Sequence, residues 1–271
     1  MDQEGREEMN ITLFSQYPHF TQHQPPKFIE WTKGDTPIHA YVNEYCWNVK
    51  QYDARNIAIM IEPRSIIPGM YDYMRNNHDK FRYIFTHDSE MLQYPNARVL
   101  YFGGVWEADP DRKKTKDISM ISSDKTMCPL HNARIQLARE LENKIDTFGT
   151  YKGSDNWVST VDAHAPYRFA VVVENYIDDY YFTEKICNCF ANKTIPIYYG
   201  ARKISEIFNP DGIIEVPSLD SVPALIDTMD WKAAYEIRLD AVEDNYKCVQ
   251  DFYCFEDHFF KQYRDLLEGM Q

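Results

Sequence analysis

The chain contains ten short apolar runs, rich in β-branched and aromatic residues, and helix-like segments separate most of them. Several runs are continuously apolar and do not alternate, for example IAIMI at 57–61 and FAVVV at 169–173. A continuous apolar run is typical of a parallel strand that helices cover on both faces. The expected strands form two series: 10–14, 38–42, 57–61, 83–87 and 98–102, then 117–122, 145–149, 169–173, 195–200 and 213–216.

The segment GGVWEADPDRKKTKD at 103–117 separates the two series. It is rich in glycine, proline and charge and has no hydrophobic period, which is typical of a linker between domains. We therefore expect an α/β protein with two domains that face each other across a cleft, spanning 1–112 and 113–248, with a final helix at 249–271. In such sheets, ligands bind beyond the carboxyl ends of the strands.

Helical periodicity predicts helices over the segments between and after these strands. Phe252, Phe255, Phe259, Tyr263 and Leu266 recur at helical spacing near the end of the chain, and such a stripe must be buried. The expected helices are 66–77, 129–143, 180–192, 201–208, 219–228, 231–246 and 251–268.

Charge and composition exclude several classes of protein. The net charge of −13 argues against general electrostatic binding of nucleic acid. No apolar run approaches the ~20 residues of a membrane helix, and the N-terminus is acidic where a signal peptide is basic. We therefore expect a soluble cytoplasmic protein without a transmembrane segment. Its six cysteines form no CxxC pair and are expected to be reduced.

The stretch YYFTEKICNCF at 180–190 places an acid beside a base. A helix beginning near Asp178 or Asp179 would carry Glu184 and Lys185 in its first two turns. A helix N-terminus bears partial positive charge and free N–H groups, so with Lys185 it is suited to a phosphate. The alternative is a capped helix with a solvent-exposed ion pair.

Three further groups of residues are candidates for a site. Arg134, expected at an exposed helix N-terminal turn, is suited to clamping a diphosphate, and otherwise is a surface arginine. Glu62 follows the strand IAIMI and is placed as a general base, although an acid before proline is often only a turn former. Asp109 and Asp111 have the spacing of a metal-binding pair, but a solvated turn is the simpler reading.

The segment 169–216 resembles the donor-binding segment of the α-1,3-fucosyltransferases, glycosyltransferase family 10. The resemblance rests on EN at 174–175, YFTEK at 181–185, and IPI at 195–197 in a strand that ends at Gly200. Upstream, NARIQLARELENKIDTFG looks like the family's helix with a phosphate-binding arginine, and MIEPRS looks like its catalytic turn. Tyr176 departs from the serine that is usual in the family.

The resemblance implies a GT-B type fold: two Rossmann-like domains, the donor bound in the second, and a C-terminal helix that crosses back to the first. It implies a metal-independent, inverting glycosyltransferase without a cofactor, which moves fucose from GDP-fucose to a hydroxyl of an oligosaccharide or glycoconjugate. Glu62 would be the catalytic base. The implied donor-binding residues are Arg134, Glu174, Asn175, Tyr181, Thr183, Glu184 and Lys185.

Three alternatives remain open at this point. The same scaffold could use another donor, such as UDP-xylose. The protein could bind a nucleotide sugar without turnover, which requires Glu62 to lie away from the site. A metal-dependent transferase would instead use Asp109 and Asp111.

Overall fold

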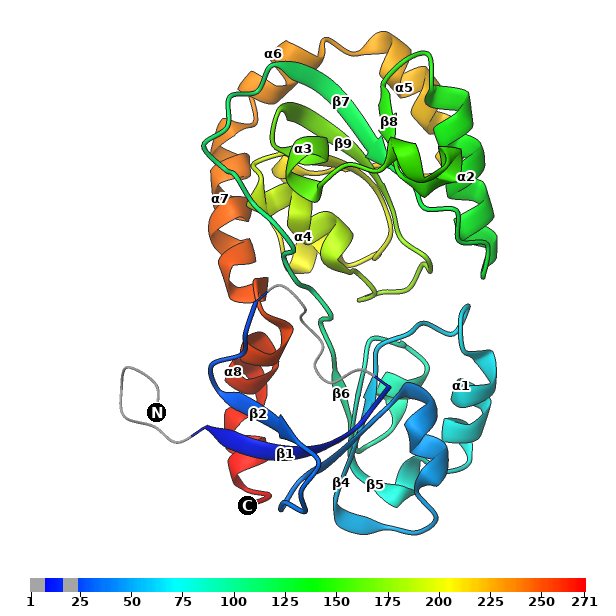
Figure 1. Ribbon diagram of the computed structural model, residues 1–271, viewed down its shortest axis with the longest axis vertical. Helices are drawn as coiled ribbons and strands as arrows, with labels where there is room; N and C mark the ends of the chain where they lie inside the picture. Colours follow the sequence, from blue (N-terminus) through cyan, green and yellow to red (C-terminus); the bar gives the residue numbers. More distant parts are fainter. Residues whose placement is uncertain (1–7, 17–23) are drawn as a thin grey trace. The chain divides into compact units, whose positions relative to one another are not determined.

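The computed structural model describes residues 8–16 and 24–271, which divide into two units (Figure 1). The first unit comprises the described residues of Met1–Gly103 together with Asp178–Tyr181 and Asp251–Gln271. The second comprises Gly104–Ile177 and Phe182–Gln250. Residues 1–7, which begin the acidic N-terminal segment, lie outside the described part. Within that part, none of the helices has both the length and the apolar character needed to cross a bilayer.

The first unit is built on six parallel strands in the order β2-β1-β3-β4-β5-β6. Five of them coincide with the predicted runs. The strand β2 was not predicted, because its sequence IEWT is short and half-polar. The strands are β1 (Met9–Phe14), β2 (Ile29–Thr32), β3 (His39–Val42), β4 (Asp53–Met60), β5 (Phe81–Thr86) and β6 (Ala97–Val99).

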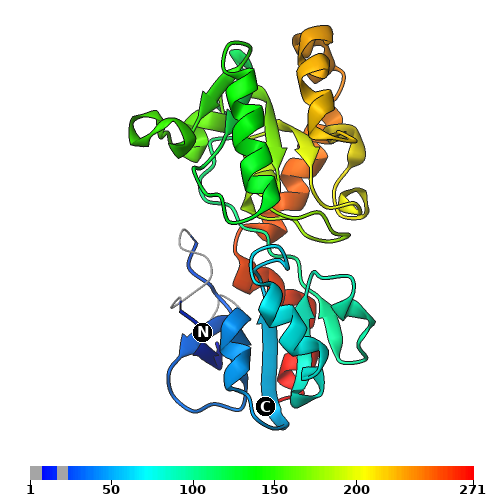
Figure 2. The ribbon, with the colours of Figure 1, turned by 90° about the vertical axis from the view of Figure 1, so that its right-hand side faces the viewer.

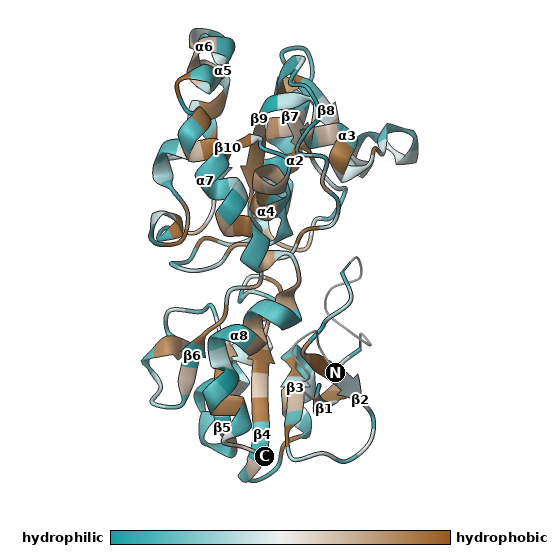
Figure 3. Ribbon diagram, turned by 90° about the vertical axis from the view of Figure 1, so that its left-hand side faces the viewer, coloured by the Kyte–Doolittle hydropathy of each residue, from teal (hydrophilic) through white to brown (hydrophobic). Residues whose placement is uncertain are grey.

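Helices cover both faces of this sheet. Ile57 and Ile59 of β4 pack in one core cluster with the helix α8 (Phe255–Glu268), whereas Ala58 and Met60 pack in another with α1 (Pro68–Arg75). Figure 2 shows α1 (cyan) and α8 (red) on opposite sides of the strands, and β4 is largely brown in Figure 3. Both faces of β4 are buried, which explains why its sequence is apolar without alternation.

The final helix α8 belongs to the first unit although it follows the second in sequence. Phe255, Phe259 and Leu267 are buried in that unit's core, and the Tyr263 hydroxyl donates to the carbonyl of Val99. The predicted aromatic stripe is therefore part of the core of the first unit.

The second unit is built on five parallel strands in the order β11-β10-β9-β7-β8. The helices α2, α5 and α6 share one core cluster with β7, β9 and β10, and α3 and α4 contact the same sheet. The strands are β7 (Lys116–Ile121), β8 (Asp146–Phe148), β9 (Tyr167–Val173), β10 (Ile195–Tyr199) and β11 (Ile214–Glu215). The helices are α2 (Pro129–Leu141), α3 (Thr160–His164), α4 (Glu184–Ala191), α5 (Val222–Thr228), α6 (Trp231–Glu236) and α7 (Leu239–Val249).

Two helix predictions were wrong. The segment 201–208 forms only a 3-10 turn at Ile204–Glu206. The helix expected at 231–246 is two helices, α6 and α7, with Ile237 exposed between them.

Residues 104–112 belong to the second unit, whereas the sequence placed the boundary after 112. Two buried asparagines hold this segment, one within α4 and one directly after it. Asn188 Oδ1 accepts from the Trp106 amide at 2.9 Å, and Asn192 Oδ1 accepts from the Asp109 amide at 2.9 Å. The polar composition of this segment predicts a linker, but buried amide side chains fix its backbone to α4.

Candidate functional site

The carboxyl end of β9 in the second unit carries a buried acid–base pair. Glu174 is fully buried, and its carboxylate accepts from the Thr183 amide at 3.0 Å, the Thr183 hydroxyl at 2.9 Å and Lys185 Nζ at 3.2 Å. Gly200 ends the neighbouring strand, and a Cβ there would lie 2.8 Å from Glu174 Cγ. Three residues of the predicted donor set, Glu174, Thr183 and Lys185, are thus in direct contact.

The helix α4 begins later than predicted. Its N-cap is Thr183, whose hydroxyl accepts from the Lys185 amide at 3.5 Å, so Asp178 and Asp179 are not its caps. The segment Asp178–Tyr181 belongs to the first unit and is not helical. Glu184 and Lys185 consequently occupy the first turn, where the helix dipole is strongest.

Lys185 remains a cation in this setting. Burial alone would lower the pKa of Lys185, but the Glu174 and Glu184 carboxylates outweigh burial and leave that pKa above its ordinary value. Glu184 lies 3.5 Å from Lys185 Nζ and is a quarter exposed. The pair at 184–185 therefore presents one fixed positive charge and one accessible carboxylate.

Arg134 of α2 lies close enough to this group for its positive charge to lower the pKa of Lys185. It is only 5% exposed, so the expectation that it lies at an exposed turn was wrong. Its guanidinium donates to Asn175 Oδ1 at 3.0 Å, to Ser123 Oγ at 3.1 Å and to the carbonyl of Val173. Ser123, which follows β7, was not predicted as part of the site, because a single serine after a strand gives no signal in the sequence.

Glu62 lies at the carboxyl end of the sheet in the first unit, a region that we define as residues 43, 61–65 and 87–90, after β3, β4 and β5. The Asn43 side-chain oxygen accepts from the amides of Ile61 and Glu62 at 2.9 and 3.1 Å, and the Tyr71 hydroxyl donates to the Glu62 carbonyl at 2.8 Å. Asn43 has a φ of 49°, a left-handed conformation that asparagine tolerates. Two side chains that the sequence did not indicate therefore fix the backbone of Glu62.

An ion pair lies two residues beyond Glu62. Arg64 donates to both oxygens of Asp88 at 2.8 and 3.1 Å, and it also contacts Glu90 at 3.0 Å. The Asp88 side chain is 2% exposed, and its carboxylate also accepts from the Met91 amide at 2.9 Å. This bidentate pair joins the turn after β4 to the turn after β5.

Tyr181 is the one member of the predicted donor set that belongs to the first unit; the other six belong to the second. Its ring packs against His87, with centroids 4.6 Å apart. Burial lowers the pKa of His87 to about 4, so this imidazole is neutral at physiological pH.

Asp109 and Asp111 lie away from these groups. The Asp109 amide is bonded to Asn192, the residue after α4, whereas Lys185 lies at the start of that helix. An eight-residue helix is ~12 Å long. Among the residues that the structure describes, no group of three or more His, Cys, Asp or Glu side chains is placed to hold a metal ion.

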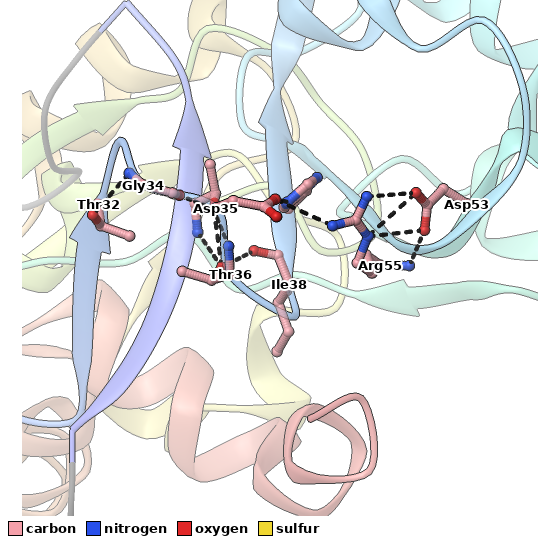
Figure 4. Close-up of polar contacts among 9 residues, drawn as sticks. Thr32, Gly34, Asp35, Thr36, Ile38, Asp53 and Arg55 are labelled. Atoms are coloured by element: carbon pink, nitrogen blue, oxygen red, sulfur yellow. Dashed lines mark hydrogen bonds and ion pairs between the residues drawn. The ribbon is translucent and has the colours of Figure 1, made fainter.

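A second charged group lies at the amino ends of β3 and β4, a region defined here as residues 34–39 and 53–55 and called the amino end of the first unit's sheet (Figure 4). Arg55 donates to both oxygens of Asp53 at 3.0 and 3.3 Å and to Asp35 at 3.1 Å. Asp35 also contacts His39 at 2.8 Å. The side chains of Arg55 and Asp53 are 42% and 38% exposed, so water reaches this group freely.

Comparison with known sequences identifies the second unit. The family model described as "Glycosyltransferase family 10 (fucosyltransferase) C-term" matches residues 111–251, just over half of the chain. A fucosyltransferase-like protein of Arabidopsis thaliana is 28% identical over 113 residues, which are 40% of this chain. The match spans 22% of the length of that relative.

Comparison with solved structures concerns the fold. An α1,3-fucosyltransferase with GDP gives a TM-score of 0.59 at 15% identity and covers 99% of this chain and 92% of its own. The same kind of enzyme with GDP-fucose gives 0.57 at 14% identity, covering 99% and 93%. TarM gives 0.54 at 13% identity, covering 85% and 54%. These neighbours are GT-B glycosyltransferases, and the predicted fold class is confirmed.

Proposed function

Because the chain belongs to glycosyltransferase family 10, we propose that this glycosyltransferase moves fucose from GDP-fucose to a hydroxyl group of an oligosaccharide or glycoconjugate, with inversion at the anomeric carbon. The observation that carries the proposal is the cluster of Glu174, Thr183, Lys185 and Arg134. It lies at the carboxyl ends of parallel strands, within the region that the family model matches.

Lys185 and Arg134 are proposed to bind the diphosphate of the donor. The buried Glu174 fixes the ammonium of Lys185. The ammonium therefore does not have to move when negative charge develops on the leaving diphosphate. Preorganised groups of this kind contribute about 3–4 kcal/mol each to transition-state stabilisation. Asn175 and Ser123 accept hydrogen bonds from Arg134, and we propose that they orient its guanidinium for the diphosphate.

Glu184 is proposed to bind the ribose hydroxyls and Tyr181 to pack near the donor. Inversion requires a base on the acceptor side that removes the proton of the attacking hydroxyl. Glu62 takes that role: it follows β4 at the carboxyl end of its sheet, and Asn43 and Tyr71 fix its backbone.

The reaction is proposed to need no metal ion and no cofactor. The positive charge comes from Lys185, Arg134 and the N-terminus of α4, which together oppose the charge of a diphosphate. Excess EDTA is therefore expected to leave turnover unchanged. A loss of turnover that Mn²⁺ restores would favour the Asp109 and Asp111 alternative.

The test of the function is a thermal-shift series with GDP, UDP, GDP-fucose and UDP-xylose, followed by turnover of each nucleotide sugar. A ligand at 100 times its Kd stabilises the fold by about 2.7 kcal/mol, which is readily measured. We expect stabilisation by GDP and GDP-fucose and its loss in Lys185→Ala. Stabilisation by the uridine nucleotides alone would assign another donor, and binding without turnover would make the protein a non-catalytic binder.

A further inference from the structure

The four residues Asp178–Tyr181 lie inside the donor motif but belong to the first unit. Ser89 holds the start of the segment: its amide donates to Asp178 Oδ2 at 3.1 Å, and its hydroxyl donates to Asp178 Oδ1. At the other end Tyr181 packs on His87, and between them Tyr180 packs on Tyr101 at 6.0 Å between ring centroids. The segment is therefore bound to the turn that follows β5.

The same turn holds the proposed base. Asp88, the residue before Ser89, receives the bidentate Arg64 guanidinium, and Arg64 is two residues from Glu62. Asp88 and Asp178 are 1% and 4% exposed, so both carboxylates need hydrogen-bond donors. Asp178 Oδ1 also accepts from the Asp179 amide at 2.8 Å. One pair of neighbouring residues thus bonds to the turn that carries Glu62 and to the segment that carries Tyr181.

We propose that Asp88 and Ser89 are positioning residues, which fix the Glu62 turn and the Asp178–Tyr181 segment in a single arrangement for transfer. The inference rests on the proposed function, since it takes Glu62 as the base. Neither residue touches substrate; each acts through the partner that it binds.

Of Asp88 and Ser89, Ser89 allows the more specific test. Ser89→Ala removes one donor from a buried carboxylate and keeps the backbone amide that serves the other oxygen. Ser89→Thr restores the hydroxyl. The matched control is Asp53→Asn, which alters a bidentate Arg–Asp pair at the amino end of the same sheet, outside the proposed network.

The first measurement is hydrogen–deuterium exchange, which needs no substrate. A hydrogen bond to a charged group shifts a local opening equilibrium by about 10-fold or more. We expect Ser89→Ala to speed exchange in the peptide covering 178–182, which contains its partner Asp178, by at least that factor, and Ser89→Thr and Asp53→Asn to leave that peptide at the wild-type rate. Unchanged exchange in Ser89→Ala overturns the proposal, whatever the donor proves to be.

The second measurement is turnover of GDP-fucose with water as acceptor, together with the Kd of GDP. A misplaced catalytic group costs up to ~10²-fold, so kcat of Ser89→Ala is expected to fall about 10- to 100-fold, with recovery in Ser89→Thr. The Kd of GDP is expected to change less than kcat, because Lys185 and Arg134, which are proposed to bind the diphosphate, belong to the second unit. Faster exchange with unchanged kcat would make Ser89 merely structural and overturn the positioning role. A wild-type enzyme without turnover would count against the proposed function, while the exchange data would still decide whether Ser89 holds the Asp178–Tyr181 segment.

Discussion

The two ends of the sheet in the first unit each hold a bidentate Arg–Asp pair, and the two pairs differ in their surroundings. Arg55 and Asp53 at the amino end are both more than a third exposed and lie two residues apart in the chain. Arg64 and Asp88 at the carboxyl end are 23% and 2% exposed and lie 24 residues apart. The same type of ion pair is therefore exposed to solvent at the amino end, whereas at the carboxyl end it is largely buried and joins the turns after β4 and β5.

The neighbours of the two pairs differ as well. The contacts at the amino end join residues 20 to 24 positions apart: Arg55 bonds to Asp35, and Thr12 bonds to Thr36. The carboxyl end receives Asp178, 89 residues away from its partner Ser89. Function in parallel α/β sheets collects at the carboxyl ends, and this sheet places its buried polar contacts there. We therefore expect changes at the carboxyl end to alter turnover or stability, and matched changes at the amino end to alter neither.

The largest effect is expected from Glu62→Gln. A general base contributes roughly 10²- to 10⁴-fold, so kcat should fall by that factor while the isosteric amide keeps the shape. The Kd of GDP should hardly change, because Lys185 and Arg134, which are proposed to bind its diphosphate, lie in the second unit. Asp53→Asn, the matched change at the amino end, should keep kcat near that of the wild type. The measurement is kcat for the donor that the wild type turns over, with GDP binding by calorimetry.

Two results would break the assignment of Glu62. Near-normal turnover in Glu62→Gln would mean that another acid is the base. A collapse of GDP binding with the fold intact would mean that Glu62 holds the ligand, and the comparison between the two ends would then concern binding and not proton transfer.

The next effect is on stability, from Arg64→Gln. This change leaves the Asp88 carboxylate buried with its backbone donor and no cation, and breaking a buried pair by removing one partner costs about 3–5 kcal/mol. Urea unfolding monitored by fluorescence measures the loss. A double variant, Arg64→Gln with Asp88→Asn, should recover part of it, because the uncompensated charge is then gone. A loss below ~1 kcal/mol in the single variant would show that the pair is no more important than a surface pair.

Most of the fold was predictable from the sequence, and the reason is local. Runs such as IAIMI and FAVVV are apolar on both faces, which fixes parallel strands and covering helices, and ten expected strands are present. The strand β2 was missed because four half-polar residues carry no period. The start of α4 was misplaced because Asp178 is a good N-cap by type, whereas its carboxylate is used by Ser89 in another part of the chain.

Residues of the candidate site were predictable from the sequence only where they belong to a short motif. Glu174, Thr183 and Lys185 stand in one short stretch, and they are in contact. Asn43 and Ser89 could not be found, because their partners are 19 and 89 residues away and an isolated asparagine or serine has no distinctive pattern. The exposure of Arg134 was misjudged for a similar reason, since helical spacing does not reveal which loops cover a helix.

A third, smaller effect concerns His87, the histidine at the carboxyl end. Burial lowers the pKa of His87 to about 4, below the ordinary value near 6.5 that it has in the unfolded chain. The unfolded state therefore binds a proton first as pH falls. The stabilising contribution of the neutral ring is complete above pH 6.5 and is lost between pH 6.5 and about 4, at up to ~1.4 kcal/mol per pH unit.

The measurement is the unfolding free energy of wild type and His87→Phe at pH 7.0 and pH 5.0. The wild type should lose more stability over this interval than the variant. Burial also lowers the pKa of His131 and of His258 to about 4, so these two histidines destabilise both proteins equally as pH falls. Equal losses in the two proteins would show that His87 is protonated in the folded state or solvated there, and Tyr181 would then lack the neutral ring on which it packs.

The smallest effect is expected from Arg55→Gln at the amino end. The guanidinium is exposed, and an exposed ion pair gains little because water and salt screen it and two long side chains must be ordered. The Asp53 carboxylate that loses its partner is accessible to water, so no buried charge is left behind.

The melting temperature of Arg55→Gln should therefore stay within about 2 °C of the wild type, and the small difference should shrink further in 1 M salt. Turnover should be unchanged, since Arg55 and Glu62 lie at opposite ends of β4. If Arg55→Gln destabilises as strongly as Arg64→Gln, or lowers kcat, then exposure does not separate the two pairs, and the division of this sheet into a solvated end and a functional end is wrong.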